Sequence, residues 1–132
     1  MWYILRGKEP VEASMAEYAA MEKGNPLWRQ LAEDVFGDEE IRVSTVFLGL
    51  DHNHSQEGPP ILFETMIFGG EHDQSQWRYW TFDEALQGHR WSVELVGQTV
   101  NLPITSCKRS DGTAGASGPP LSTTRRLRLH RE

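Results

Sequence analysis

The chain has 132 residues, 38% of them hydrophobic, and a formal net charge of −6 at pH 7. This length is enough for one domain with a modest core and excludes two substantial domains. Residues 1–97 carry 17 acidic and 7 basic side chains, a net charge of −10. We therefore expect this part to repel nucleic acid, which only the basic end of the chain would attract.

The single cysteine, Cys107, excludes an internal disulfide and is typical of a reducing compartment. Arg6, Lys8 and Glu9 interrupt the first segment, where a signal peptide would need an unbroken apolar run. No segment approaches the roughly 18 apolar residues of a membrane-spanning helix. We therefore expect a cytoplasmic protein with no membrane partner.

The first third of the chain predicts a short strand and two helices. The strand is expected at Trp2–Leu5, before a turn at residues 7–10. Ser14 and Glu17 form a capping-box pattern, which predicts a helix from Met15 to Lys23. Asn25 can cap a second helix, with Pro26 at its first position. The buried face of this second helix is expected to contain residues at helical spacing: Leu27, Trp28, Leu31, Ala32 and Val35.

Two apolar runs, VSTVFLGL (43–50) and ILFETMIF (61–68), have the length and composition of core strands in a β-meander. The strand at 41–50 is apolar on both sides, so helices should cover one face and the amino-terminal segment or a second copy the other. If a second copy covers this face, the protein forms a homodimer, and we keep this as a prediction. A third strand at 76–81 alternates like an edge strand.

A second capping box, Thr81 and Glu84, opens a helix that runs through Val96 and carries His89 on its inward side. After Gly97 the helical pattern fades, and from about Lys108 onward the composition turns to Gly, Ser and Pro with a basic end, which predicts disorder. The predicted fold is α+β: a three- to four-stranded antiparallel β-meander packed with two or three helices. Residues 1–98 form the domain and residues 99–132 the flexible tail.

The loop DHNHSQEGPP contains Asp51, His52 and His54, which are residue types that bind zinc, manganese or iron. Asp51 and His52 are thus candidate metal ligands, and a divalent metal is the one cofactor that the sequence suggests. A polar loop of this kind is more often only a solvated connection. His72 is expected a strand length from His52, at the other end of the meander.

Glu64 is unusual because its neighbours on the same strand face are Leu62 and Met66. The carboxylate either lies at an exposed edge or is held by a partner such as Thr45, Arg42 or a backbone N–H. A buried, unpaired Glu64 would have a raised pKa and could serve as a catalytic base. Nucleophile, nucleotide-binding and zinc-protease motifs are absent, which lowers the expectation of an enzyme.

Three segments, VSTVFLGLDH (43–52), PPILFETMIFGG (59–70) and RYWTFDEALQGHRWSVELV (78–96), follow one another in this order. Together they resemble a family of small uncharacterised proteins encoded by bacteriophages, prophages and related mobile elements. The resemblance covers about residues 2–96 and implies a phage or prophage origin and an accessory role, without an activity to transfer. The positions that match the family pattern are Asp51, His52, Pro60, Glu64, Thr65, Gly69, Gly70, Gly88 and His89.

Three functions are compatible with these features. We favour a non-enzymatic protein that binds and inhibits or modulates a host protein, for instance a defence factor. The alternatives are a metal-dependent hydrolase or nuclease centred on Asp51, His52 and Glu64, with a metal-bound water as nucleophile, and a structural or assembly module of a virion. The candidate binding residues are Asp51, His52, Glu64, Thr65, Trp77, Trp80 and His89.

Overall fold

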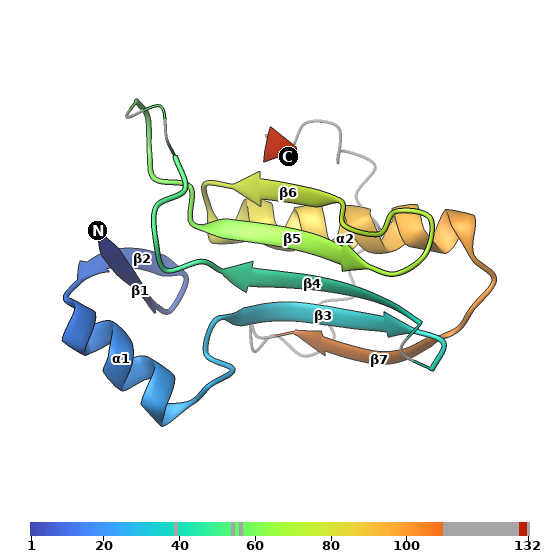
Figure 1. Cartoon of the computed structure of the whole chain (residues 1–132), viewed down its shortest axis with the longest axis horizontal. Coiled ribbons are helices and arrows are strands. Elements are labelled where there is room, and N and C mark those ends of the chain that lie inside the picture. The colour runs from blue at the N-terminus through green and yellow to red at the C-terminus, as the bar shows by residue number, and fades with distance from the viewer. Residues whose placement is uncertain (39, 54, 56, 110–129, 132) are drawn as a thin grey trace.

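The computed structural model describes residues 1–38, 40–53, 55, 57–109 and 130–131 (Figure 1). The described part is an α+β fold with two helices, one larger antiparallel sheet and a separate two-stranded sheet. In chain order the elements are β1 (Trp2–Arg6), β2 (Glu9–Ala13), α1 (Met15–Gly24), β3 (Gln30–Phe36), β4 (Ile41–Phe47), β5 (Phe63–Phe68), β6 (Gln76–Tyr79), α2 (Phe82–Thr99), β7 (Ile104–Arg109) and β8 (His130–Arg131).

We call the first three elements the N-terminal lobe. The strands β1 and β2 form an antiparallel hairpin, and its turn includes Gly7 at φ +65°. The helix α1 follows directly, and the predicted capping box is present: Ser14 Oγ accepts the Glu17 N–H, and Glu17 Oε1 accepts the Ser14 N–H. The predicted first strand and first helix are confirmed, whereas β2 was not anticipated.

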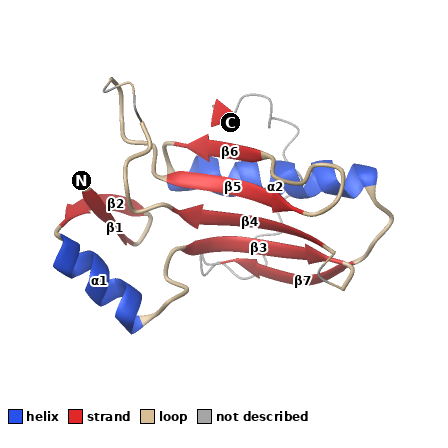
Figure 2. Cartoon of the chain, viewed as in Figure 1, coloured by secondary structure: helices blue, strands red, loops and turns tan. Residues whose placement is uncertain are grey.

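The larger sheet has the strand order β7-β3-β4-β5-β6-β8, so β3 to β6 form a four-stranded meander (Figure 2). The predicted strands at 41–50, 61–68 and 76–81 correspond to β4, β5 and β6, and the meander is confirmed. The sheet contains more strands than predicted, because β3 and β7 pair along one side of it.

The second predicted helix is wrong, because residues 30–36 form strand β3. The capping signal at Asn25 is real, since Asn25 Oδ1 accepts the Leu27 N–H at 3.1 Å, but it begins a turn instead of a helix. Beyond this turn β3 pairs with β4 on one side and β7 on the other. These two ladders satisfy the backbone groups of β3 and override its helical pattern.

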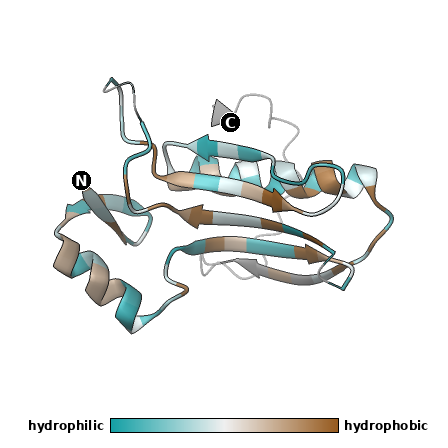
Figure 3. Cartoon of the chain, viewed as in Figure 1, coloured by the Kyte–Doolittle hydropathy of each residue, from teal (hydrophilic) through white to brown (hydrophobic). Residues whose placement is uncertain are grey.

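The helix α2 lies across one face of the sheet, behind β5 and β6 in the view of Figure 1. The sheet's inner face packs against it through the alternate, buried residues Val43, Thr45, Phe47, Phe63, Thr65, Ile67, Trp77 and Tyr79. The hydrophobic stretches of β4 and β5 lie in the middle of the sheet (Figure 3). This helix begins after Thr81, as predicted.

The opposite, outer face of the sheet is only partly buried. On β4, Arg42 is exposed and Ser44 and Val46 are half-buried, so the prediction that both faces of this strand are covered holds for the inner face alone. Polar neighbours explain the difference, because Glu64 and Arg78 lie beside Val46 in the same row of the sheet. The predicted homodimer therefore stays a prediction.

Residues 104–109, which the sequence assigned to the flexible tail after residue 98, form strand β7 and pair with β3. The segment contains Ile104, Thr105 and Cys107. Its ladder with β3 adds backbone hydrogen bonds, and such long-range pairing cannot be predicted from local composition. The predicted tail otherwise falls mostly on residues 110–129, which lie outside the described residues.

A ladder of aromatic rings joins the N-terminal lobe to the sheet. Successive ring centroids lie 4.5 to 6.2 Å apart, in the order Trp2, Tyr18, Trp28, Phe47, Phe63 and Phe82. The lobe is also tied to the end of β4, since the Tyr3 N–H donates to the Gly49 carbonyl at 2.9 Å. Tilted and edge-on ring pairs of this kind stabilise beyond their buried area.

Candidate functional site

The loop after β4 is held together by Asp51 and Asn53. Asp51 Oδ1 accepts the backbone N–H groups of Asn53 at 2.7 Å and Ile61 at 2.9 Å, which joins the two ends of the loop. Asn53 Nδ2 donates to the carbonyls of Glu57 and Pro59. Asp51, a candidate metal ligand, therefore serves as a hydrogen-bond acceptor for the loop backbone.

His52 lies half-buried at the start of the same loop. Its Nδ1 is 2.8 Å from the Leu50 carbonyl, so Nδ1 carries the proton and Nε2 keeps a lone pair. An imidazole oriented in this way can bind a metal, but a site needs further ligands. His54 lies outside the described residues, and among those that are described no group of three or more His, Cys, Asp and Glu side chains could hold a metal ion.

Glu64 is paired with Arg78 on the outer face of the sheet. The two residues are register partners on β5 and β6, and Arg78 Nε donates to Glu64 Oε2 at 2.9 Å. The side chains are 13% and 18% exposed, so the ion pair is largely shielded from water. Of the arrangements that the sequence left open for Glu64, the structure places the carboxylate with a protein partner, which is Arg78 instead of Thr45 or Arg42.

A buried polar chain runs through the core beneath α2. His89 Nε2 lies 2.8 Å from Asp34 Oδ1, His89 Nδ1 lies 2.7 Å from Thr45 Oγ1, and Thr45 and Thr65 share a hydrogen bond of 2.5 Å. His89 Nε2 is placed to donate to the Asp34 carboxylate, whereas donor and acceptor between Nδ1 and the Thr45 hydroxyl depend on the protonation of the ring. The residue types resemble a nucleophile, base and carboxylate.

This buried chain lies away from solvent. His89, Thr45 and Thr65 are 0% exposed and Asp34 is 1% exposed, so a substrate has no access to the hydroxyl groups. These hydrogen-bonded side chains join β3, β4, β5 and α2 and act as a structural connection between helix and sheet. Sequence reasoning missed Asp34 because it was placed on a helix; its alternation with Ala32 and Phe36 along a strand was the signal.

Tyr79 lies at the edge of the same buried region. A side chain at Gly88 would collide with the Tyr79 ring, so this glycine allows the ring to lie directly against α2. Burial raises the pKa of Tyr79 well above its usual value, and the hydroxyl lies beside Thr65 and Ser92 without a hydrogen bond of good geometry to the described residues. Tyr79 is thus neutral in the folded protein.

The two candidate tryptophans lie in different surroundings. Trp77 is 5% exposed and packs edge-on against Trp91 at 5.1 Å, so it belongs to the core together with Thr65 and His89. Trp80 is half-buried at the end of β6 and contributes to the wall of a cavity. Of the seven candidate binding residues, Trp80 alone lies on this cavity wall.

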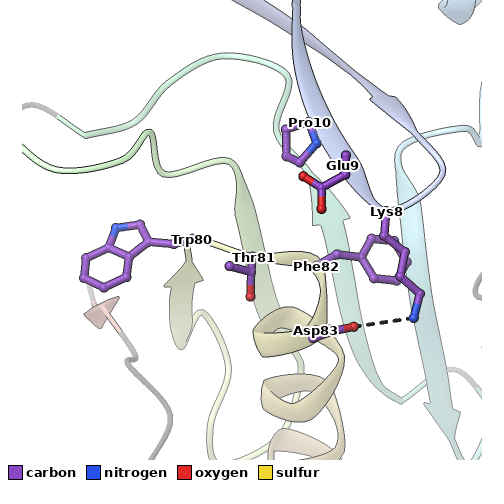
Figure 4. A pocket seen from close by; sticks show the side chains of 7 residues that line it. All are labelled: Lys8, Glu9, Pro10, Trp80, Thr81, Phe82 and Asp83. Carbon is purple, nitrogen blue, oxygen red and sulfur yellow. Dashed lines mark ion pairs between the residues drawn. The ribbon is translucent and has the colours of Figure 1, made fainter.

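The cavity lies between the β1–β2 turn and the first turn of α2, with a volume of about 330 Å³ (Figure 4). In Figure 4 the Lys8 side chain lies over the Phe82 ring and reaches Asp83, whereas the Trp80 ring points away from them. The ammonium is 5.7 Å from the ring centroid and 3.5 Å from Asp83 Oδ1. No sequence motif indicated this cavity, because the hairpin and α2 are distant in the chain.

Comparisons with known proteins identify no relative. No family model matches the chain, and neither a curated protein nor a solved structure matches it.

In the part of the chain that the structure describes, neither helix has the length and apolar character needed to cross a membrane.

Proposed function

We propose that this chain is a non-enzymatic protein-binding module, encoded by a phage or mobile element, that binds and modulates a protein of the bacterial host. The observation that carries the proposal is the solvent-exposed side of α1, which presents Met15, three alanines and Lys23. The ion pair of Glu64 with Arg78 also favours binding over hydrolysis, because the carboxylate already has a protein partner and is only 13% exposed to a substrate.

Helix α1 buries none of its ten residues. Met15 is 64% exposed, and Ala16, Ala19 and Ala20 are also exposed. The four-residue spacing of 15 with 19 and of 16 with 20 places these side chains on one side of the helix, and Lys23, four residues after Ala19, is exposed on the same side. A helix in a small domain normally turns its apolar side to the core. An apolar helix side that faces water is typical of a protein-binding surface.

The other side of α1 is firmly attached. The Tyr18 ring contacts Trp2 and Trp28, and Glu22 Oε1 accepts hydrogen bonds from Trp28 Nε1 at 2.9 Å and Arg29 Nε at 2.7 Å. The exposed side is therefore presented by a helix whose position is already set. A preorganised surface loses less conformational entropy when it binds.

The charge of the chain indicates the kind of partner. Residues 1–97 have a net charge of −10, and Glu9, Glu12 and Glu17 of the N-terminal lobe are exposed. An acidic surface complements a partner whose binding surface is basic. The resemblance to phage and prophage proteins suggests that this partner is a host factor, such as a component of a defence system.

The test is affinity capture from host lysate with two matched variants. Ala19→Glu places one negative charge on the exposed side of α1, and Gln98→Glu places one on the exposed end of α2. We expect a partner that the wild type and Gln98→Glu retain and that Ala19→Glu loses. Equal capture by both variants would exclude α1 as the binding surface, and capture of nothing by the wild type would count against the binding function.

A further inference from the structure

The cavity between the β1–β2 turn and α2 has the chemistry of a cation site. We infer that it binds a primary alkylammonium group, and that Lys8 is a competitor for this site within the same chain (Figure 4). The inference does not depend on α1 or on the partner proposed above.

The walls supply both components of ammonium recognition. The Phe82 ring, which is 6% exposed, lies beneath Lys8, and Glu9 and Asp83 also line the cavity. An aromatic face attracts a cation through its quadrupole, and a carboxylate adds charge and a hydrogen-bond acceptor. The Lys8 ammonium makes both contacts, because its Nζ lies 5.7 Å from the Phe82 ring centroid and 3.5 Å from Asp83 Oδ1.

The first turn of α2 disfavours an anion in the same cavity. Thr81 Oγ1 already accepts the Glu84 N–H at 3.1 Å, and Glu84 Oε1 accepts the N–H groups of Trp80 and Thr81 at 3.2 Å. These contacts occupy backbone donors that would otherwise bind an anion, and Asp83 and Glu84 offset the positive end of the helix dipole. The groups that remain for a ligand are the carboxylates of Glu9 and Asp83 and the Phe82 ring.

Lys8 can leave the site at little cost. Its side chain is 57% exposed and that of Asp83 is 74% exposed, so water screens their ion pair. Lys8 also follows Gly7, at φ +65°, in the turn between β1 and β2. A ligand ammonium must replace this weak internal contact, so removal of Lys8 should strengthen ligand binding by about five- to tenfold.

The ammonium could come from a lysine side chain of a protein or from a free polyamine. Both present a primary ammonium on an unbranched alkyl stem, as Lys8 does, and a cavity of about 330 Å³ accommodates such a stem. Acetyl-lysine methylamide, acylated only on its α-nitrogen, represents the first source, and spermidine represents the second.

The experiment is a titration of the full chain followed by the backbone amide NMR signals of residues 80–83. The proteins are the wild type, Lys8→Ala, the double variant Lys8→Ala/Asp83→Asn, and Lys23→Ala, which removes a positive charge from an exposed position on α1. The neutral probe acetyl-norleucine methylamide controls for the alkyl stem. Unchanged signals outside the cavity verify that each variant is folded.

We expect saturable shifts with the lysine probe or spermidine in Lys8→Ala, about five- to tenfold weaker binding in the wild type and in Lys23→Ala, and loss of binding in the double variant. The tighter of the two probes identifies the source of the ammonium. Absence of saturable shifts in Lys8→Ala, equal shifts with the norleucine probe, or equal affinity of Lys8→Ala and Lys23→Ala would overturn the inference.

Discussion

Glu64 and Arg78 form a shielded ion pair on the outer sheet face, and the sequence alone was compatible with Glu64 as a catalytic base. We expect Glu64→Gln to lower the free energy of unfolding by about 1–2 kcal/mol, because Arg78 loses a charged acceptor in a partly buried place. Urea unfolding at pH 7 measures the change.

Glu57→Gln is the matched control for that substitution, since Glu57 is exposed in the loop after β4. We expect it to change the free energy of unfolding by less than about 0.5 kcal/mol. Equal effects of the two substitutions would show that the Glu64 carboxylate has no special structural role.

Tyr79 is expected to make the free energy of unfolding fall as the pH becomes alkaline. Burial raises its pKa in the folded state above the unfolded value of 10.0, so its contribution is complete below pH 10 and is lost as the pH rises toward the folded pKa. We expect Tyr79→Phe to lose less stability than the wild type between about pH 9 and pH 11. Urea unfolding at several pH values tests this.

At neutral pH the same substitution should change the free energy of unfolding by less than about 1 kcal/mol, since the Tyr79 hydroxyl has no well-formed hydrogen bond among the described residues. Tyr3 and Tyr18, whose pKa values burial also raises, remain in both proteins. An identical alkaline loss in wild type and variant would contradict the role of Tyr79.

At the scale of elements, the β5–β6 turn is expected to depend on Gly69. Its φ is +89°, and a side chain there would collide with the Glu40 carbonyl in the adjacent β3–β4 turn. We expect Gly69→Ala to destabilise the protein by about 2 kcal/mol or more, because both strain and a clash oppose it. Thermal unfolding followed by circular dichroism measures the loss.

Gly97 provides the opposite case in α2. A side chain at this helical position would meet no atom within 4 Å, so Gly97→Ala should stabilise the protein by about 0.5–1 kcal/mol. A similar loss of stability in both variants would mean that the β5–β6 turn does not impose a special backbone conformation at Gly69.

The elements with a local signal were predictable from sequence. Two capping boxes marked the starts of α1 and α2, and the apolar runs marked β4 and β5. The strand β3 was not predictable, because Leu31, Ala32 and Val35 fit a helical stripe and only the ladders with β4 and β7 decide in favour of a strand. The same limit applies to the site: the Asp34–His89 pair and the Lys8 cavity join residues far apart in the chain.

At the scale of the whole molecule, the contacts of β7 concern the residue at which the folded domain ends. The sequence divides the chain at residue 98, but β7 pairs with β3, the Gly37 N–H donates to the Pro103 carbonyl at 2.9 Å, and Thr105 Oγ1 donates to the Gly37 carbonyl at 2.6 Å. We expect a chain of residues 1–98 to be about 1–3 kcal/mol less stable than one of residues 1–109, because an entire ladder is lost.

Urea unfolding of the two truncated chains measures this difference, and hydrogen exchange locates it. Faster exchange in the shorter chain should be concentrated on the β3 amides that face β7. Equal stability of the two chains would support the division at residue 98 and assign β7 no role in the fold.

The position of β7 also has a consequence for synthesis on the ribosome. Strand β3 emerges early and pairs with β4 soon afterwards, but its other neighbour is made only after β5, β6 and the whole of α2. Until then a nascent chain presents the unpaired N–H and C=O groups of β3 along an open strand edge, which other nascent chains can join. Adjacent ribosomes on one message would bring such edges together, so the period between the synthesis of β3 and that of β7 is when this protein is most exposed to misassembly.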